Sequence, residues 1–334
     1  MTGTATDTTP RLEDSLPIID LGGFRLDEAA ADRTARALDQ AFSDIGFCYI
    51  ANTGVDQSLI DGVFEASRRF HAQGQAAKDA LAINDFHRGY MAPNTSVIQT
   101  SSVAKVTKPN YSESFMLMHE VAADDPDFGR PLQGPNQWPA DVPGFREAVV
   151  AYNSALQDVA RNFTHLIARA LNLAPTTLDP RFAKPTTFLR LLHYPPQPVD
   201  SADDEFGSAP HTDYGFITIL AQDNVGGLEV RKRGGGGAWI KATPLPGTFV
   251  VNVGDMLARW TNGRWQSTPH RVKNLSPTDR YSVPFFYDPG MDEVIECLPS
   301  CVGPGEAPRH PPVRYGDYLM ERLNKNYDYR KPAQ

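Results

Sequence analysis

The sequence predicts a mainly β fold with helices packed beside it, and three observations support this prediction. Short β-branched and aromatic runs follow one another after residue 188, at the spacing of roughly 8–12 residues that is typical of sandwiches and barrels. Amphipathic helical patterns occupy the first half, and the longest, over 144–173, needs a broad apolar surface to lie on. The 334 residues, of which 41% are hydrophobic, are enough to form a core without disulfide or metal support.

The individual elements follow from apolar periodicity and from the glycine- and proline-rich turns between the runs. Strands are expected first at 16–21 and 46–50, and helices at 27–44, 58–73 and 144–173. Seven further strands are expected at 188–194, 216–221, 228–231, 238–241, 248–253, 270–273 and 281–287.

These elements indicate a single domain over residues 16–330, preceded by a mobile tail over the polar, threonine-rich residues 1–15. Within the domain, a mainly helical part over 16–180 precedes a β core over 181–290, and a loop and helix follow over 291–330. The chain contains no internal repeat, so we expect the helices to flank one β core.

The composition limits the classes of function. A net charge of −8, from 32 basic and 40 acidic residues, argues against nucleic acid as a partner, because phosphate binding depends on clustered lysine and arginine. Three cysteines do not suggest a disulfide framework, which fits a reducing cytosol. No apolar run approaches the roughly 20 residues of a membrane span, and no signal peptide is evident. We therefore expect a cytoplasmic protein without a membrane partner, of unknown oligomeric state.

Two histidines and one aspartate form a candidate metal site. His211 and Asp213 make an H-x-D motif at the start of an apolar run, so on an extended segment both side chains would point to one side. His270 begins another strand-like run. Two imidazoles and one carboxylate form a triad that leaves positions open on iron, although zinc hydrolases use the same ligand types. The motif alone therefore leaves both metals open.

An R-x-S motif strengthens the prediction of a functional site around these three residues. Arg280 and Ser282 share one face of a predicted strand, and Pro284 and Phe286 continue that face. Arg280 would lie at the polar mouth of an apolar lining, where its guanidinium can bind a carboxylate through two hydrogen bonds and the hydroxyl can add a third. Alone, the motif is better explained by an exposed arginine at a strand end. In the order H-x-D, H, R-x-S the combination is specific.

These motifs together resemble the isopenicillin N synthase-like family of non-haem Fe(II)/2-oxoglutarate-dependent dioxygenases. The resemblance extends from Leu16 to about Tyr327 and is densest between His211 and Phe286. The matching segments are LPIIDL, GFCYI, HRGYM, ESF, LLHYPP, HTDYGFITIL, GGLEV, VNVGDML, TNGRWQSTPHRV, RYSVPFF and YGDYL.

The resemblance implies a double-stranded β-helix, a distorted jelly roll, with helices on one side. It implies an oxidoreductase of secondary metabolism that hydroxylates, desaturates or cyclises a small molecule, using Fe(II), 2-oxoglutarate and O₂ and releasing succinate and CO₂. Ascorbate is a further candidate cofactor. By resemblance, the ligands of Fe(II) are His211, Asp213 and His270. The residues that bind the distal carboxylate of 2-oxoglutarate are, likewise by resemblance, Arg280, Ser282 and Tyr194.

Two alternatives to this activity remain. An Fe(II) oxidase of the same fold would not use 2-oxoglutarate, and members of that kind share the R-x-S motif. A non-catalytic jelly-roll binding module would belong to another class, although such a protein would not need an intact triad. Succinate formation separates the first alternative from the main interpretation, and Fe(II) affinity separates the second.

The substrate pocket is less well defined by the sequence. In the family, substrate contacts come from the N-terminal segment, the early strands and the C-terminal helix. The residues expected to line the pocket are Arg88, Tyr90, Met91, Asn110, Tyr111, Phe115, Phe188 and Phe286. The last helix, which begins near Tyr315, is expected either to cover the mouth of the barrel or to lie on the surface. Asn252, Gly254 and Asp255 match an N-x-G-D turn that we interpret as structural.

Overall fold

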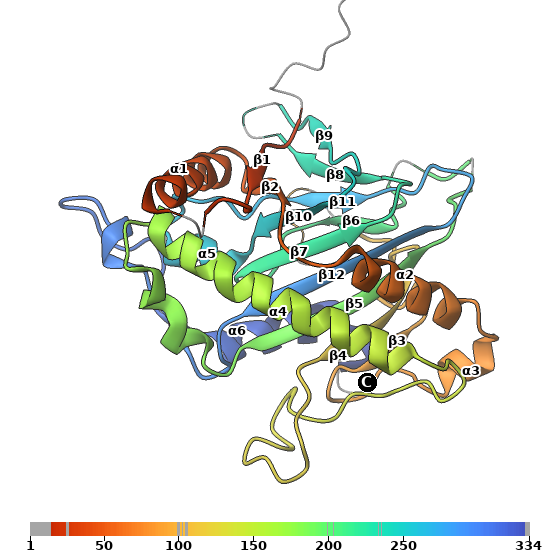
Figure 1. Ribbon diagram of the computed structural model, residues 1–334. Coiled ribbons are helices and arrows are strands. Elements are labelled where there is room, and N and C mark those ends of the chain that lie inside the picture. The colour runs from red at the N-terminus through yellow and green to blue at the C-terminus, as the bar shows by residue number, and fades with distance from the viewer. Residues whose placement is uncertain are drawn as a thin grey trace, which may run out of the picture.

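Two β-sheets lie at the centre of the computed structural model, which describes residues 15–330 except for 25–26, 99–100, 102, 104–105, 199, 203, 233 and 235 (Figure 1). The larger sheet has the strand order β1 (Ile18–Asp20), β2 (Phe47–Ala51), β10 (Thr248–Val253), β7 (Ile217–Gln222), β12 (Arg280–Asp288), β5 (Thr186–Tyr194), β4 (Glu113–Met118) and β3 (Gly89–Met91). The smaller sheet has the order β6 (Ser208–His211), β11 (His270–Val272), β8 (Leu228–Arg231) and β9 (Trp239–Lys241). A short pair consists of β13 (Val294–Ile295) and β14 (Val313–Arg314).

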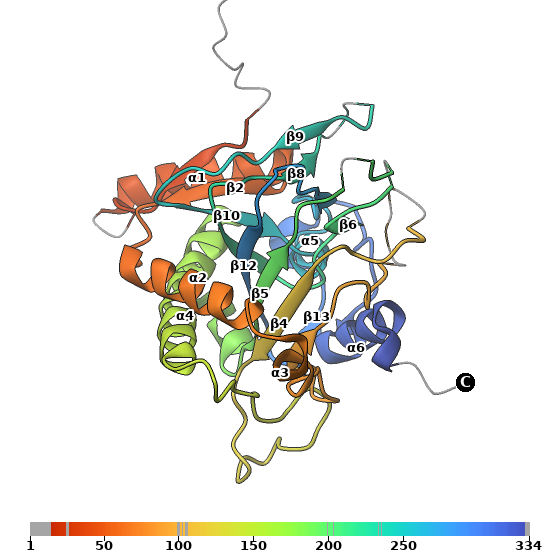
Figure 2. The same cartoon turned by 90° about the vertical axis from the view of Figure 1, so that its right-hand side faces the viewer.

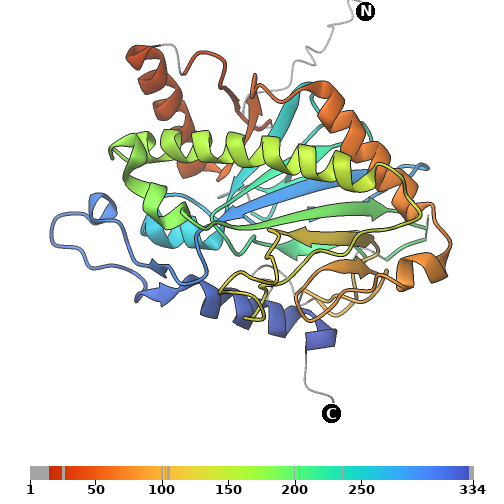
Figure 3. The same ribbon diagram turned by 60° about the horizontal axis from the view of Figure 1, so that its bottom comes forward.

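Helices cover both sides of the larger sheet. The helices are α1 (Glu28–Asp44), α2 (Gln57–His71), α3 (Gln75–Asp79), α4 (Phe145–Ala170), α5 (Asp255–Trp260) and α6 (Tyr315–Asn326). Single 3₁₀ segments span Pro175–Phe182, Pro299–Cys301 and Asp328–Arg330. Helices α2 and α4 lie side by side along one face of β5 and β12 (Figure 3), whereas α6 lies on the opposite side of these strands (Figure 2).

Local sequence explains where the longer helices begin and which side they bury. Asp27 caps α1 by accepting a hydrogen bond from the backbone N–H of Ala30 at 2.6 Å, and Asp56 caps α2 through Ser58 at 2.8 Å. In α4, residues such as Tyr152 and Leu156 recur at helical spacing and are fully buried. Burying a large apolar side chain stabilises the fold by roughly 1.5–3 kcal/mol, so this row fixes α4 on the sheet.

The predicted fold class is confirmed, because the strands of two facing sheets surround the H-x-D motif and helices flank them. The bounds predicted at 228–231 and 248–253 are those of β8 and β10. Within the two sheets, β3, β4 and β6 were not predicted, and neither was the short pair β13 and β14. The part of the chain expected to be mainly helical thus supplies four strands of the larger sheet, β1 to β4.

The H-x-D motif occupies a different position from the one expected. His211 is the last residue of β6, and Asp213 lies in the connection to β7, so the motif does not open the strand at 216–221. The tail predicted at 1–15 lies outside the described residues, apart from Ser15. No helix in the described ranges is both long and apolar enough to cross a bilayer.

Candidate metal centre and adjoining cavities

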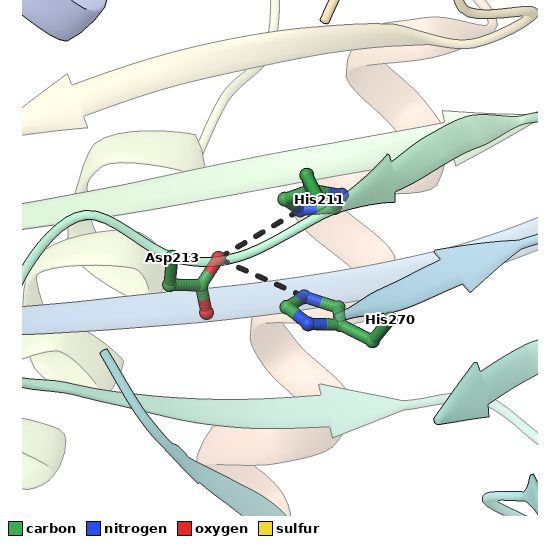
Figure 4. A group of neighbouring side chains, drawn as sticks. All are labelled: His211, Asp213 and His270. Atoms are coloured by element: carbon green, nitrogen blue, oxygen red, sulfur yellow. Dashed lines mark ion pairs between the residues drawn. The ribbon is translucent and has the colours of Figure 1, made fainter. Parts of the chain in front are cut away.

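The two histidines of the triad are brought together by strand pairing. β6 and β11 run antiparallel with His211 and His270 directly opposite each other. The Nε2 atoms of both rings lie 3.7 Å from Oδ1 of Asp213 (Figure 4). The three ligand atoms all lie within 4.8 Å of one another, which is the spacing of donors around a single ion.

Hydrogen bonds orient each of the three donors. The Nδ1 atoms of His211 and His270 lie 2.8 Å from the carbonyl of Ala209 and 3.2 Å from that of Thr268. With Nδ1–H donating to a carbonyl, each ring presents the lone pair of Nε2 toward Asp213.

The carboxylate of Asp213 is held in the same way. Its Oδ2 accepts hydrogen bonds from the Asn252 side-chain amide at 2.7 Å and from the Thr218 hydroxyl. This leaves Oδ1 facing both imidazoles. The donor set therefore fits Fe(II), which accepts two neutral imidazoles and one carboxylate.

Electrostatics favour the protonation states that a metal requires. Burial, together with the neighbouring His270, lowers the pKa of His211 to about 4, so its ring is neutral at pH 7. Burial would raise the pKa of Asp213, but the two imidazoles and the hydrogen bonds from Thr218 and Asn252 outweigh it and lower the pKa. A metal therefore does not have to displace protons from these two ligands at neutral pH.

A cavity of about 80 Å³ extends from the triad to the R-x-S motif. Arg280 is fully buried, and its guanidinium lies 4.7 Å from the ring of Tyr194. Nη1 donates to the Ser282 hydroxyl at 3.3 Å and Nη2 to Gln222 at 3.5 Å, while Nε has no hydrogen-bond partner among the described residues. A buried guanidinium with only long, neutral contacts at the end of a cavity fits a carboxylate ligand.

A second cavity, of about 110 Å³, adjoins the first at the triad. Its walls include Phe188 and Phe286, whose rings meet edge to face at 6.2 Å, together with Leu319 and Leu323 of α6. Helix α6 therefore contributes to the wall of this cavity. His211, Asp213 and Phe286 line both cavities, so a ligand in either one meets the triad.

The structure places three of the eight residues expected in the pocket at the second cavity. Asn110, Phe188 and Phe286 line it, whereas Arg88, Tyr90, Met91, Tyr111 and Phe115 do not. Arg88 is fully buried and donates to the carbonyls of Leu132 and His119, both at 2.8 Å. The hydroxyl of Tyr90 donates to Glu113, and Phe115 packs against Phe70 at 4.6 Å.

A left-handed residue explains why Arg88 points away. His87 has φ of +66°, which changes the direction in which successive side chains leave the backbone. The His87 ring, and not Arg88, lines the second cavity, where it contacts Phe188 edge to face at 6.1 Å and its Nδ1 shares a hydrogen bond with the Tyr329 hydroxyl.

Two further residues at the site were not predicted to act there. Asn252, interpreted as part of a structural turn, orients the carboxylate of Asp213. Arg190, on β5, lines both cavities. The sequence did contain a signal for Arg190, because the alternation that places Phe188 and Tyr194 on the inner face of the strand places residue 190 there as well.

Comparisons with known proteins agree with this geometry. Residues 185–289 match the family described as the 2OG-Fe(II) oxygenase superfamily, and residues 16–141 match the N-terminal region described as non-haem dioxygenase in morphine synthesis. Among relatives, the 2-oxoglutarate-Fe(II) type oxidoreductase hxnY of Emericella nidulans is 35% identical over 93% of this chain and 90% of its own length. Kihadalactone A synthase LFS of Citrus sinensis is 33% identical over 93% of each chain.

A solved structure shows the same fold. A full-length Neurospora crassa protein, solved in complex with alpha-KG and thymine, superposes with a TM-score of 0.83 at 29% identity and covers 95% of this chain and 98% of its own. The sequence motifs, the triad with its adjoining cavities and these similarities over nearly the whole length agree. The chain therefore belongs to the 2OG-Fe(II) oxygenase superfamily and is an Fe(II)- and 2-oxoglutarate-dependent oxygenase.

Proposed function

We propose that His211, Asp213 and His270 hold Fe(II), that Arg280, Ser282 and Tyr194 bind 2-oxoglutarate, and that the cavity beyond the triad holds a small molecule that is hydroxylated. One observation carries the assignment: the cavity of about 80 Å³ has the triad at one end and a buried arginine without a carboxylate partner among the described residues at the other. A dicarboxylate that chelates a metal and reaches an arginine matches this arrangement.

The residues of the chain bind, orient and exclude water. Bound Fe(II) with 2-oxoglutarate supplies O₂ activation coupled to decarboxylation to succinate and CO₂. Arg280 offers two parallel N–H groups to the distal carboxylate, and the Ser282 hydroxyl adds a third donor. The ring of Tyr194, stacked on the guanidinium at 4.7 Å, limits the orientations that Arg280 can take and keeps this end of the cavity dry.

Small-molecule substrates are supported by the structural neighbours. The Neurospora crassa protein was solved with thymine, and JOX2, which superposes with a TM-score of 0.76 at 27% identity, was solved with 2OG, Fe and JA. Hydroxylation is the reaction that we propose first, and desaturation and cyclisation are the alternatives. A cytosolic location is part of the proposal and is supported by three cysteines that are all free thiols.

The test is an anaerobic titration of the Fe(II)-loaded protein with 2-oxoglutarate, following the visible charge-transfer band of a chelated 2-oxo acid. We expect the band in the wild type, and in Arg280→Ala we expect a dissociation constant raised about 10- to 100-fold, because hydrogen bonds to charged groups contribute about 1.5–3 kcal/mol. Arg161→Gln, on the exposed face of α4, is the matched control.

Each other outcome has a definite meaning. An unchanged affinity in Arg280→Ala would remove this residue from the cosubstrate site. Bound iron without the band would support the oxidase that does not use 2-oxoglutarate. Absence of Fe(II) binding would support the non-catalytic module.

A further inference from the structure

Arg190 is a cation in the wall of the active-site cavities without an acidic partner among the described residues. It lies in the middle of β5, half-buried, and Nε donates to the Ser114 hydroxyl at 2.9 Å. No ion pair joins Arg190 to a carboxylate within the part of the chain that the structure describes. Taking a guanidinium partly out of water without a counter-charge is unfavourable, so its position indicates that a ligand supplies one.

If the iron site is occupied as in the proposed function, on which this inference rests, the charges around the triad leave the positive charge of Arg190 without a negative partner. Fe(II) carries two positive charges, and Asp213 carries one negative charge. The two carboxylates of 2-oxoglutarate balance the remaining charge of the iron site and that of Arg280. Arg190 then adds one positive charge at the wall that the two cavities share, and a monoanionic substrate would neutralise it.

No other described group in the second cavity takes up this charge. Besides Asp213, its acidic lining residue is Asp288, a buried residue at the end of β12. Both oxygens of Asp288 are occupied, since Oδ1 accepts from the backbone N–H of Phe216 at 2.6 Å and Oδ2 from the Tyr315 hydroxyl at 2.7 Å. Burial raises the pKa of Asp288 to about 7, so this carboxyl is only about half ionised near neutral pH, and no ion pair among the described residues joins it to Arg190.

The rest of the cavity accepts an apolar body. Ile98, Leu319 and Leu323 contribute aliphatic surface, and Phe188 and Phe286 contribute ring surface. Phe188 precedes Arg190 by two residues on the same face of β5, so ring and guanidinium lie next to each other. A small molecule with an apolar body and one carboxylate complements these walls.

We propose that Arg190 determines substrate specificity by binding a carboxylate of the substrate, so that this oxygenase acts on small apolar monocarboxylic acids. Arg190 lines the cavity and donates to Ser114 through Nε, and its two Nη groups are then the donors that can form two parallel hydrogen bonds with a carboxylate. In this proposal Arg280 binds the cosubstrate and Arg190 binds the substrate.

The experiment measures binding, not turnover. Anaerobic protein loaded with Fe(II) and 2-oxoglutarate is titrated by calorimetry with matched acid and amide pairs: benzoate and benzamide, phenylacetate and phenylacetamide, and 3-phenylpropanoate and 3-phenylpropanamide. In the wild type we expect at least one acid to bind about tenfold or more tightly than its amide. Arg190→Gln should abolish this preference, Arg190→Lys should retain part of it as a point charge, and Arg161→Gln should keep all of it.

The same samples separate this inference from the proposed function. If the wild type shows the 2-oxoglutarate band and Arg190→Gln binds 2-oxoglutarate with unchanged affinity, the proposed cosubstrate site is supported. The preference for acids over amides then tests the role of Arg190 in substrate binding. Equal binding of acids and amides, or binding of none of the acids, overturns the inference. A loss of 2-oxoglutarate affinity in Arg190→Gln as large as that in Arg280→Ala would also overturn it, because Arg190 would then serve the cosubstrate.

Discussion

Single residues decide how the carboxylate of Asp213, the proposed metal ligand, is oriented. Asp213 would be a flexible ligand on a loop if its second oxygen were free. Asn252 and Thr218, from β10 and β7, occupy that oxygen, so the carboxylate approaches a metal through Oδ1 alone. The orientation of the ligand is therefore set by strands of the larger sheet, although both histidines belong to the smaller one.

We expect Asn252→Ala to weaken Fe(II) binding about 10- to 100-fold, which is the usual effect of removing a hydrogen-bond partner of a metal ligand. The measurement is an anaerobic Fe(II) titration followed by calorimetry. Asn162→Ala, which removes an exposed amide on α4, is the control and should bind Fe(II) as the wild type does. Equal affinity of the two variants would show that Asn252 has only a structural role.

The roles of single residues were predicted less completely from the sequence than the helices and strands. The triad and R-x-S could be recognised because they combine rare residue types in a fixed order. Arg88 is expected in the pocket by resemblance alone, and resemblance does not reveal the left-handed conformation of His87 that turns the Arg88 side chain away. The orienting role of Asn252 depends on a contact with Asp213, and the spacing of the two residues along the chain gives no indication of it.

At the scale of elements, a buried charge network joins β4 and β5 to α3 on the helix-covered face. Glu113 accepts hydrogen bonds from Lys78 at 2.8 Å, from His193 at 2.7 Å and from the Tyr90 hydroxyl. Burial would raise the pKa of Glu113, but these donors outweigh it and lower the pKa to about 2. Its charge therefore persists at neutral pH and links four elements, β3, β4, β5 and α3.

His193 makes this network sensitive to pH. Burial would lower its pKa, but hydrogen bonds to Glu113 and to Asp279, the latter at 2.9 Å, outweigh burial and raise it. A raised pKa means that the protonated ring stabilises the fold below the unfolded value of about 6.5, and that this contribution is lost as the pH rises through the higher folded value.

We therefore expect His193→Gln to lower the free energy of unfolding more at pH 6 than at pH 8. Urea denaturation of wild type and variant across this range is the measurement. In a Glu113→Gln background the pH dependence of the difference should shrink, although that variant should itself be destabilised by about 3–5 kcal/mol, because Lys78 loses its buried partner. A difference that does not change with pH would contradict a protonated His193.

Elements were predicted more successfully than contacts between them. The run of aromatic and β-branched residues in β10 and the helical row of α4 are strong local patterns, and both segments have the predicted type. β6 was missed because Ser208, Ala209 and Pro210 are weak strand formers and the strand exists through its pairing with β11. Pairing between distant segments cannot be read from either segment alone.

At the scale of the whole molecule, the proposed ligands bridge both sheets. His211 and His270 come from the smaller sheet, whereas Arg280 and the groups that orient Asp213 come from the larger one. These strands are far apart in the sequence, so the site exists only when the double-stranded β-helix is complete. Fe(II) and 2-oxoglutarate should consequently bind the folded chain and not the unfolded one.

This linkage predicts a stability change. At about 100 times the dissociation constant, a ligand that binds only the folded state raises the free energy of unfolding by about 2.7 kcal/mol. We expect Fe(II) with 2-oxoglutarate to stabilise the wild type by at least this amount in anaerobic denaturation, with the added hydrogen-exchange protection concentrated in β6, β11 and β12. Asp213→Ala should fold without ligands but gain nothing from them, whereas Asp158→Ala, on the exposed side of α4, should gain as much as the wild type. An equal gain in Asp213→Ala would mean that the metal binds elsewhere.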